Sequence, residues 1–414
     1  MRMATASVTA LDVRADFPIL AREIGGRRLV YLDSASTSQK PLAVLAALDD
    51  YYRNHNANIH RGVYTLAQEA DALFEGARAR IAAFVRWPVA STIFTRNVTE
   101  AINLVAYSWA RETLAPGDAV LISEMEHHSN IVPWQLATQA TGAQLRYLEV
   151  GDDGTLSLED LDAQLARGDV ALVAVAHISN VLGTINPVAE IVARAHEAGA
   201  LVLIDGAQAV PQMPVDLGAL SADFYAWTGH KALGPTGVGV LHARAELLER
   251  MPPFLAGGDM ILTVEAQRST WNELPWKFEA GTSMIAQAIG LGAAVDYLDA
   301  LGMSNVRAHE RALTAQALER LRALDGVTVF GPRGAEERGG VISFALDGIH
   351  AHDIGELLNR RNVCVRASHH CAQVLMRRLG VGATARASFG PYNVGADVDA
   401  LIEAIVEAQE VFAR

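Results

Sequence analysis

Four short runs of apolar residues recur through the first two thirds of the chain, at 119–123, 171–176, 201–204 and 237–241. They do not alternate with polar residues, which is typical of strands buried on both faces of a sheet. Stretches expected to be helical, such as 131–141 and 188–198, separate the runs. This alternation of strand and helix predicts an α/β fold built on a doubly wound, mainly parallel sheet.

Polar residues stand at the ends of these expected strands. In such a sheet, ligands bind outside the carboxyl ends of the strands. The polar groups there are Glu126-His127-His128, His177-Ile178-Ser179-Asn180, Asp205-Gly206-Ala207-Gln208 and, before the fourth run, Thr228-Gly229-His230-Lys231. Each has an ordinary explanation as loop chemistry, but together they indicate one site at one edge of the sheet.

A helix start is expected at Asn97-Val98-Thr99-Glu100, which has the spacing of a capping box. Val98, Ile102, Val105 and Trp109 then fall on one helical face. The first turn offers free backbone N–H groups and the Thr99 hydroxyl, which suit an anion such as a phosphate. The same pattern also fits a cap that only stabilises its helix.

The two ends of the chain have a different pattern from the middle. Residues 11–24 follow a loose helical period, and no structure is expected for 1–10. Beyond about 290 we expect a long helix (305–323), shorter strands (328–330, 341–346, 363–366) and a closing amphipathic helix (397–412). The predicted organisation is an N-terminal arm (1–28) packed on the small domain, a large domain (29–299) and a small C-terminal α+β domain (300–414).

Composition narrows the class of protein. The net charge of −13 over 414 residues argues against non-specific binding to nucleic acid or to an anionic membrane surface. No stretch reaches the roughly 18 apolar residues of a membrane span, and the N-terminus lacks a signal-peptide pattern. Two cysteines, Cys364 and Cys371, exclude a disulfide framework, and no Cys/His spacing resembles a zinc site. A cytoplasmic location is expected.

Lys231 is the first candidate for chemistry. A lysine held in a dry site loses its proton readily and becomes a nucleophile for carbonyl compounds, although a surface lysine at a strand end remains the alternative. With Asp205, His127 and the Thr99 turn, the set matches the needs of pyridoxal 5′-phosphate. These are a Schiff-base lysine, a carboxylate for the pyridine nitrogen, a ring that stacks, and a phosphate-binding helix start.

Over nearly its whole length, from about Val13, the chain resembles the Suf-type (group II) cysteine desulfurases, class V members of the fold-type I pyridoxal-phosphate enzymes. The matching stretches are YLDSAS (31–36), NIHRG (58–62), TEAINLVA (99–106), MEHHSNIVPWQ (125–135), HISNVLGT (177–184), DGAQAV (205–210), TGHKALGPTGVG (228–239), FEAGT (278–282) and HHCAQVLM (369–376). The resemblance implies a seven-stranded sheet in the large domain, and conversion of L-cysteine to L-alanine.

The resemblance also implies roles for individual residues. Lys231 would bind the cofactor and move the Cα proton, Asp205 would pair with the pyridinium nitrogen, and Gln208 would bond the ring hydroxyl oxygen. His127 would stack on the ring, Thr99, Thr228 and His230 would bind the phosphate, and Thr282 would contact the phosphate of the other subunit of a homodimer. Asn180 would contact cofactor and substrate, and Arg386 would bind the substrate carboxylate. Arg366, His60 and Arg61 would lie at the substrate entrance, and His128 would have a structural role.

Cys371 is the second candidate for chemistry. It follows two histidines, and Arg366 stands five residues earlier, so its neighbours favour the thiolate nucleophile. The resemblance makes it the carrier of a persulfide, whereas Cys364, inside a strand-like run, is expected to be an ordinary buried thiol.

The chain departs from the family pattern at two positions: Ser368 stands where the family usually has glycine, and Ser283 stands where proline is common. They bear on loop mobility, rate and substrate preference.

Other functions remain open at this point. A selenocysteine lyase would share the cofactor machinery and need Cys371 less. An aminotransferase or epimerase of the same fold is disfavoured by Cys371, and a catalytically silent binding module is disfavoured by the intact Lys231 and Asp205. The resemblance further implies iron–sulfur cluster assembly through a SufE-like acceptor or a zinc-containing SufU-like one. His352 is a possible contact with that zinc, or only a solvent-facing or capping histidine.

Overall fold

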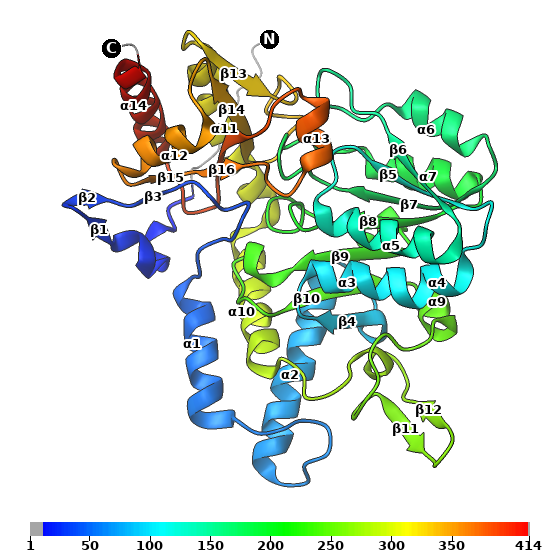
Figure 1. Ribbon diagram of the computed structural model, residues 1–414. Helices are drawn as coiled ribbons and strands as arrows, with labels where there is room; N and C mark the ends of the chain where they lie inside the picture. The colour runs from blue at the N-terminus through cyan, green and yellow to red at the C-terminus, as the bar shows by residue number, and fades with distance from the viewer. Residues whose placement is uncertain (1–10, 413–414) are drawn as a thin grey trace, which may run out of the picture.

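The computed structural model describes residues 11–412, which form a large α/β part and a smaller C-terminal part (Figure 1). The expectation for residues 1–10 lies outside the described residues. Among those described, no helix is long and apolar enough to cross a membrane, and no group of three or more His, Cys, Asp or Glu side chains could hold a metal ion.

The large part is built on a seven-stranded sheet of order β4-β10-β9-β8-β7-β5-β6. β10 runs antiparallel to β4 and β9, and the other neighbours are parallel. The strands are β4 (Thr92–Thr95), β5 (Ala119–Ser123), β6 (Gln144–Leu148), β7 (Val170–Ala176), β8 (Leu201–Asp205), β9 (Phe224–Thr228) and β10 (Gly239–Ala243). The predicted fold class, a doubly wound and mainly parallel seven-stranded sheet, is therefore confirmed.

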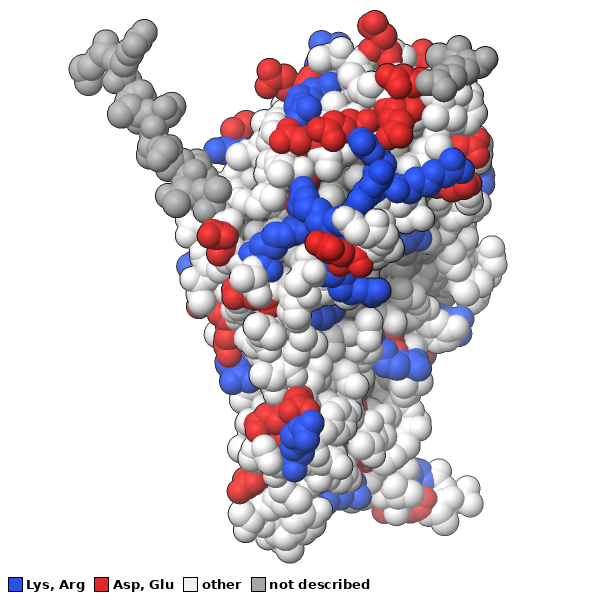
Figure 2. Space-filling model, turned by 90° about the vertical axis from the view of Figure 1, so that its left-hand side faces the viewer, with Lys and Arg blue, Asp and Glu red and all other residues white. Residues whose placement is uncertain are grey.

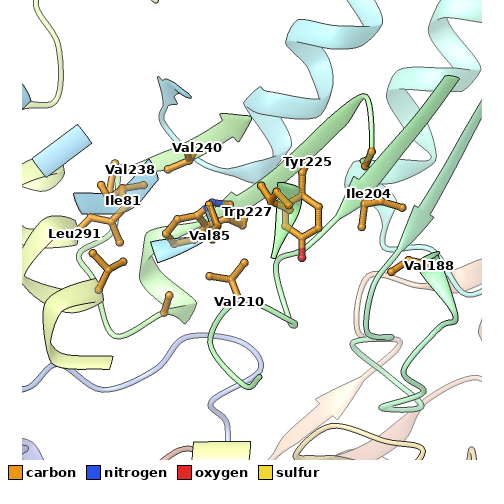
Figure 3. Close-up of a cluster of buried hydrophobic side chains, with 14 of the residues drawn as sticks. Ile81, Val85, Val188, Ile204, Val210, Tyr225, Trp227, Val238, Val240 and Leu291 are labelled. Atoms are coloured by element: carbon orange, nitrogen blue, oxygen red, sulfur yellow. The ribbon is translucent and has the colours of Figure 1, made fainter. Parts of the chain in front are cut away.

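Alternate residues of the central strands enter two different cores. On β7, Val173 and Val175 join one core, while Leu172 and Ala174 join the other. Figure 3 shows part of the first core, where Trp227 of β9 lies between Tyr225 of the same strand and the group formed by Ile81, Val238 and Leu291. Helices α2 (Thr65–Phe84), α6 (Leu158–Leu165), α7 (Val188–Glu197) and α10 (Ile285–Leu301) cover that face, and α3 (Val98–Val105), α5 (Val132–Thr141) and α9 (Ala245–Arg250) cover the other. Burial on both faces explains why these strands are continuously apolar.

The small part is an antiparallel sheet of order β13-β14-β17-β16 with helices packed on it. Its core includes Phe344 of β14, Leu318 of α11 and Ile405 of α14. The elements are α11 (Met303–Arg322), β13 (Val327–Phe330), β14 (Val341–Leu346), α12 (Ala351–Asn359), β15 (Val363–Cys364), β16 (Arg366–Ser368), α13 (Gln373–Arg378), β17 (Thr384–Ser388) and α14 (Gly395–Phe412).

The helix expected over residues 11–24 is wrong. The segment forms two short 3-10 turns, η1 (Arg14–Asp16) and η2 (Pro18–Ala21), followed by the hairpin β1 (Glu23–Ile24) and β2 (Arg27–Arg28). Pro18 explains the break, because proline lacks an N–H and disfavours helical backbone at the preceding residue. Phe17, whose backbone is accordingly not helical (φ −111°, ψ 88°), ends the first turn.

The N-terminal segment contacts the C-terminal one. Arg14 and Arg28 both form ion pairs with the buried carboxylate of Asp397 on α14, at 3.3 and 2.7 Å. Strand β3 (Val30–Tyr31) pairs in parallel with β15. The predicted domain boundary at residue 29, which assigns β3 to the large domain, does not anticipate this pairing.

The remaining elements are short or peripheral. Helix α1 (Leu42–Asp50) packs on α10. The others are η3 (Tyr51–His55), η4 (Val89–Ser91), η5 (Ala106–Ala110), α4 (Arg111–Thr113), η6 (His128–Asn130), α8 (Leu217–Leu220), η7 (Gly229–Lys231), β11 (Ile261–Val264), β12 (Ser269–Trp271) and η8 (Trp276–Phe278).

Candidate active site

A cavity of about 260 Å³ lies at the carboxyl ends of the parallel strands, and we call it the Lys231 cavity. It brings together most of the residues singled out in the sequence. The lining comprises Ala35, Ser36, Asn97, Val98, Thr99, His127, Ser129, Ala176, Ile178, Asn180, Asp205, Ala207, Gln208, His230, Lys231, Arg366, His370, Cys371 and Arg386. The expected convergence of strand-end residues on one edge is what the fold produces.

Lys231 lies on η7, directly after β9, with its amine toward the cavity residues. Burial lowers its pKa to about 8, and although Asp205 opposes this shift, the guanidinium groups of Arg386 and Arg366 add to it. About a tenth of the amine is therefore unprotonated at pH 7, far more than for an ordinary lysine, and this unprotonated form is the one that acts as a nucleophile or base. The alternative of a solvated surface lysine does not fit this position.

Asp205 ends β8 with its carboxylate buried. Its Oδ1 accepts a hydrogen bond from the backbone N–H of Ala207 at 3.0 Å. Burial raises its pKa, and among the described residues no side chain forms an ion pair with it. A cationic ring nitrogen placed against this carboxylate would supply the missing partner.

His127 presents a neutral ring to the cavity. Its Nδ1 accepts a hydrogen bond from the backbone N–H of Ser129 at 3.1 Å, and burial lowers its pKa to about 3. The Ser129 hydroxyl lies 3.0 Å from the same Nδ1 and 2.7 Å from the Thr99 hydroxyl. Sequence reasoning missed Ser129, although its place two residues after His127 was a usable signal.

The N-terminus of α3 forms one wall of the cavity. Asn97 accepts a hydrogen bond from the Glu100 backbone N–H at 3.0 Å, which confirms the predicted cap. Thr99 stands beside it in the lining with His230, whose pKa burial lowers to about 4. Thr228 lies at the end of β9 outside the lining, and its buried hydroxyl has no hydrogen-bond partner among the described residues.

Two arginines of the small part reach the cavity. Arg386 on β17 is 2 % exposed, and burial lowers its pKa to about 10, so it stays cationic at neutral pH. Its Nη2 donates to the Ser36 hydroxyl at 2.7 Å and to Asp33 at 3.2 Å. Arg366 on β16 donates to the same Ser36 hydroxyl at 2.9 Å. Sequence reasoning missed Ser36 as the residue that joins the two guanidinium groups.

Cys371 lies in the loop between β16 and α13 and is half-buried. His370 and Cys371 both have left-handed backbone, with φ of 51° and 55°. The Ser368 hydroxyl accepts a hydrogen bond from the His370 backbone N–H at 2.9 Å, so the serine fastens this turn. His370 was also missed; it lines the cavity, and burial lowers the pKa of its ring to about 2.

Comparison with known proteins identifies the family. The family model described as aminotransferase class-V matches residues 30–401. The chain belongs to the class-V aminotransferase family. Within it, the chain is 52% identical over 403 residues to a protein of Halobacterium salinarum named probable cysteine desulfurase, with 97% of each covered. It is 48% identical over 415 residues to the cysteine desulfurase of Haloferax volcanii, again with 97% of each covered.

Solved structures of this class-V group agree. The apo cysteine desulfurase of Thermococcus onnurineus NA1 matches with a TM-score of 0.92 and 36% identity, covering 98% of both chains. The cysteine desulfurase CsdA of Escherichia coli, in an S-sulfonic acid form, matches with a TM-score of 0.88 and 39% identity, covering 96% of this chain and 98% of that one.

Class-V aminotransferases use pyridoxal 5′-phosphate, and the Lys231 cavity fits that group. Within residues 11–412, the buried Asp205 carboxylate has no ion-pair partner and the Thr228 hydroxyl has no hydrogen-bond partner, and the first turn of α3 offers backbone N–H groups. These are complements to a ring nitrogen and a phosphate. Gln208 lines the same cavity, and its Nε2 is held by the Ala35 carbonyl oxygen at 2.8 Å.

Besides Thr228, three residues expected at the site of this class-V enzyme lie outside the cavity lining of their own chain. Thr282 lines a separate hollow, which shares Asn97 and His230 with the cavity. His60 and Arg61 line another hollow, where their side chains lie 3.2 Å from Asp71 and 3.4 Å from Asp259, respectively. Cys364 is also outside, in β15, where it is half-buried against the core rather than fully buried as expected, and burial raises the pKa of its thiol.

Proposed function

We propose that this protein is a pyridoxal-phosphate-dependent cysteine desulfurase that converts L-cysteine to L-alanine and collects the sulfur on Cys371. The observation that carries the proposal is that Cys371, from a loop of the small part, lines the same cavity as Lys231 and Asp205 of the large part. The names of the relatives support it. It is tested by measuring alanine formed from cysteine, alongside the visible spectrum of the bound cofactor.

Different residues of the chain would bind different parts of the cofactor. Asp205 would hold the ring nitrogen, the neutral ring of His127 would lie against the ring, and Gln208 would bond the ring oxygen. Thr99, Thr228 and His230 would hold the phosphate with the N-terminus of α3. When bound, pyridoxal 5′-phosphate supplies an electron-accepting ring that stabilises negative charge at the substrate Cα.

Substrate handling falls to residues from both parts. Arg386 is cationic and has a fixed fork of donors, which suits the substrate carboxylate. Asn180 lies beside it in the lining, and Arg366 faces the same space. The Lys231 amine, with a pKa of about 8, removes the Cα proton once the substrate occupies the site.

Sulfur transfer balances without an outside oxidant. The Cys371 thiolate attacks the substrate sulfur, so the new S–S bond forms as the Cβ–S bond breaks. The electron pair of the broken bond stays on the carbon side, where protonation gives the methyl group of alanine. The net change is cysteine plus a protein thiol to alanine plus a protein persulfide.

A selenocysteine lyase remains the second candidate from the sequence. The half-buried position of Cys371 in the cavity lining favours the desulfurase, because a lyase needs that thiol less. Turnover of cysteine and selenocysteine by Cys371→Ala separates the two. Loss of both activities together would leave no sign of the lyase, whereas retained selenocysteine turnover alone would show a secondary lyase activity.

A homodimer is part of the proposal. Exposed apolar side chains gather on and after α1, and Figure 2 shows that the lower half of this face, over α1, is mostly uncharged. They are Leu42, Leu45, Tyr52, Val63, Tyr64 and Leu66. A second chain covering them would let Thr282 reach the phosphate of its neighbour, and would bring His60 and Arg61 toward the substrate entrance. Mixed dimers of Lys231→Ala and Thr282→Ala chains should then regain activity in one of their two sites.

The sulfur acceptor is proposed to be a small carrier protein serving iron–sulfur cluster assembly, of the SufE-like or zinc-containing SufU-like kind, in the cytoplasm. His350 caps α12, since its Nδ1 accepts a hydrogen bond from the His352 backbone N–H at 3.3 Å. The His352 side chain is not the cap and stays exposed, which suits contact with a partner's zinc. Partner-stimulated activity unchanged in His352→Ala would remove this contact from the proposal.

A further inference from the structure

One residue of the large part, His128, forms hydrogen bonds on both sides of Cys371. Its backbone N–H donates to the carbonyl oxygen of Cys371 at 2.7 Å. Its ring Nε2 accepts a hydrogen bond from the backbone N–H of Gln373 at 3.1 Å. Because these two bonds bracket Cys371 and the next residue, they fix where this stretch of the loop lies against the large part.

The bond to Gln373 also completes a helix end. Helix α13 begins at Gln373, and its N-cap, Ala372, makes no side-chain hydrogen bond. The first N–H groups of a helix have no partner within it, so a cap must come from elsewhere. The ring of His128 provides that cap from outside the small part, and it can do so only through an unprotonated Nε2.

The loop that His128 holds is in an unfavourable conformation. His370 and Cys371 both have left-handed backbone, which brings Cβ close to the following carbonyl oxygen and is unfavourable for any residue except glycine. Such backbone persists where surrounding contacts over-determine it. Besides the Ser368 hydroxyl, two contacts come from the large part: Asn180 Nδ2 donates to the His370 carbonyl oxygen at 2.8 Å, and the His128 backbone N–H donates to the Cys371 carbonyl oxygen.

His128 is joined to the cofactor site through its neighbour. His127, directly before it, turns its ring into the Lys231 cavity, while His128 turns toward the cysteine loop, and the two ring centres are 6.3 Å apart. The two consecutive residues at the start of η6 therefore have different contacts: His127 faces the cavity, and His128 holds the loop that contains Cys371. This arrangement sets the spacing between the two reacting parts of the site.

We propose that His128 is a positioning residue that holds the Cys371 thiol at the Lys231 cavity by capping α13 and bonding the Cys371 carbonyl, and so sets the rate of sulfur attack. The rate effect rests on the proposed function, whereas the clamp itself does not. His128 is not among the residues that line the Lys231 cavity, so its removal leaves Lys231, Asp205 and His127 in the lining.

The test compares His128→Ala with His128→Gln in the holoenzyme. Alanine removes the acceptor, whereas the glutamine Oε1 has a reach similar to that of Nε2 and restores it. Loss of one hydrogen bond of about 1–1.5 kcal/mol should speed amide hydrogen exchange in residues 372–376 and lower kcat about tenfold in His128→Ala. The KM for cysteine and the visible spectrum of the bound cofactor should stay close to those of the unaltered protein, and His128→Gln should recover most of both losses.

Two outcomes would overturn the inference. One is exchange and kcat in His128→Ala equal to those of the unaltered protein. The other is a His128→Gln variant as impaired as His128→Ala, which would show that the ring fills space rather than accepts a bond. If no form of the protein makes alanine from cysteine, the proposed function fails, and the exchange measurement still decides whether His128 clamps the loop.

Discussion

Arg386 of the small part donates a hydrogen bond through Nη1 to the backbone carbonyl oxygen of Asn180 in the large part, at 2.8 Å. A second donor, Nη2, is held by Ser36 and Asp33. The guanidinium is therefore fixed before any substrate arrives, and its buried Nε has no partner among the described residues. A preorganised cation with a free donor is well suited to bind a carboxylate, because little side-chain entropy is lost on binding.

Replacing Arg386 by lysine should weaken substrate use although it keeps the charge. Lysine cannot present the planar fork, so the anchoring bonds to Asn180 and Ser36 cannot all be kept. Losing a buried, charge-assisted contact of about 2–4 kcal/mol should lower kcat/KM for cysteine roughly 30- to 1,000-fold. Steady-state kinetics measure this effect, and a thermal unfolding midpoint separates it from misfolding. A folded Arg386→Lys variant with unchanged kcat/KM would contradict the carboxylate role.

The pH dependence of cofactor binding should report the shifted Lys231 amine. The unprotonated amine is the nucleophile, so it is scarce below its pKa and abundant above it. Because burial lowers that pKa to about 8, the rate at which the apoprotein binds pyridoxal 5′-phosphate should rise with pH and level off above about 8. A stopped-flow series read at the visible band tests this. A rate still rising steeply toward the ordinary lysine pKa of about 10.4 would show a solvated amine.

The positions of the reactive strand-end residues could be predicted, and the reason is geometric. Asp205 ends strand β8 and Lys231 follows strand β9. Because these two strands are parallel neighbours in the sheet, their carboxyl ends lie at the same edge, whatever the conformation of the loops. Ser36 and His370 could not be found this way, because they reach the cavity through pairings between segments more than 300 residues apart, such as β3 with β15. Strand β4 was missed for a different reason, since Thr92-Ile93-Phe94-Thr95 is too short and mixed to stand out.

A buried ion pair near the Thr282 segment should be needed for stability. Arg78 on α2 is fully buried and bonds Glu279 through two nitrogens, at 2.6 and 2.9 Å. Glu279 also accepts the Phe94 backbone N–H at 2.7 Å, so the pair ties α2, β4 and the residues before Thr282 together.

Arg78→Ala should therefore cost about 3–5 kcal/mol of unfolding free energy, because it leaves the Glu279 carboxylate buried without its partner. Chemical denaturation measures this loss. The matched control is Arg53→Ala, which removes an exposed helical ion pair with Asp49 and should cost about 0.5 kcal/mol or less. Equal losses of unfolding free energy in the two variants would show that the buried ion pair stabilises the protein no more than an exposed one.

The central claim is that Cys371 takes the sulfur of cysteine, and a single-turnover reaction without an acceptor tests it most directly. The holoenzyme is mixed with one equivalent of cysteine per site, and alanine and the mass of the Cys371 peptide are measured together. The account predicts alanine in step with the gain of one sulfur atom on Cys371, and loss of both in Cys371→Ser with the cofactor spectrum retained. Alanine formed at the normal rate by Cys371→Ser, or sulfur found on Cys364 instead, would contradict it.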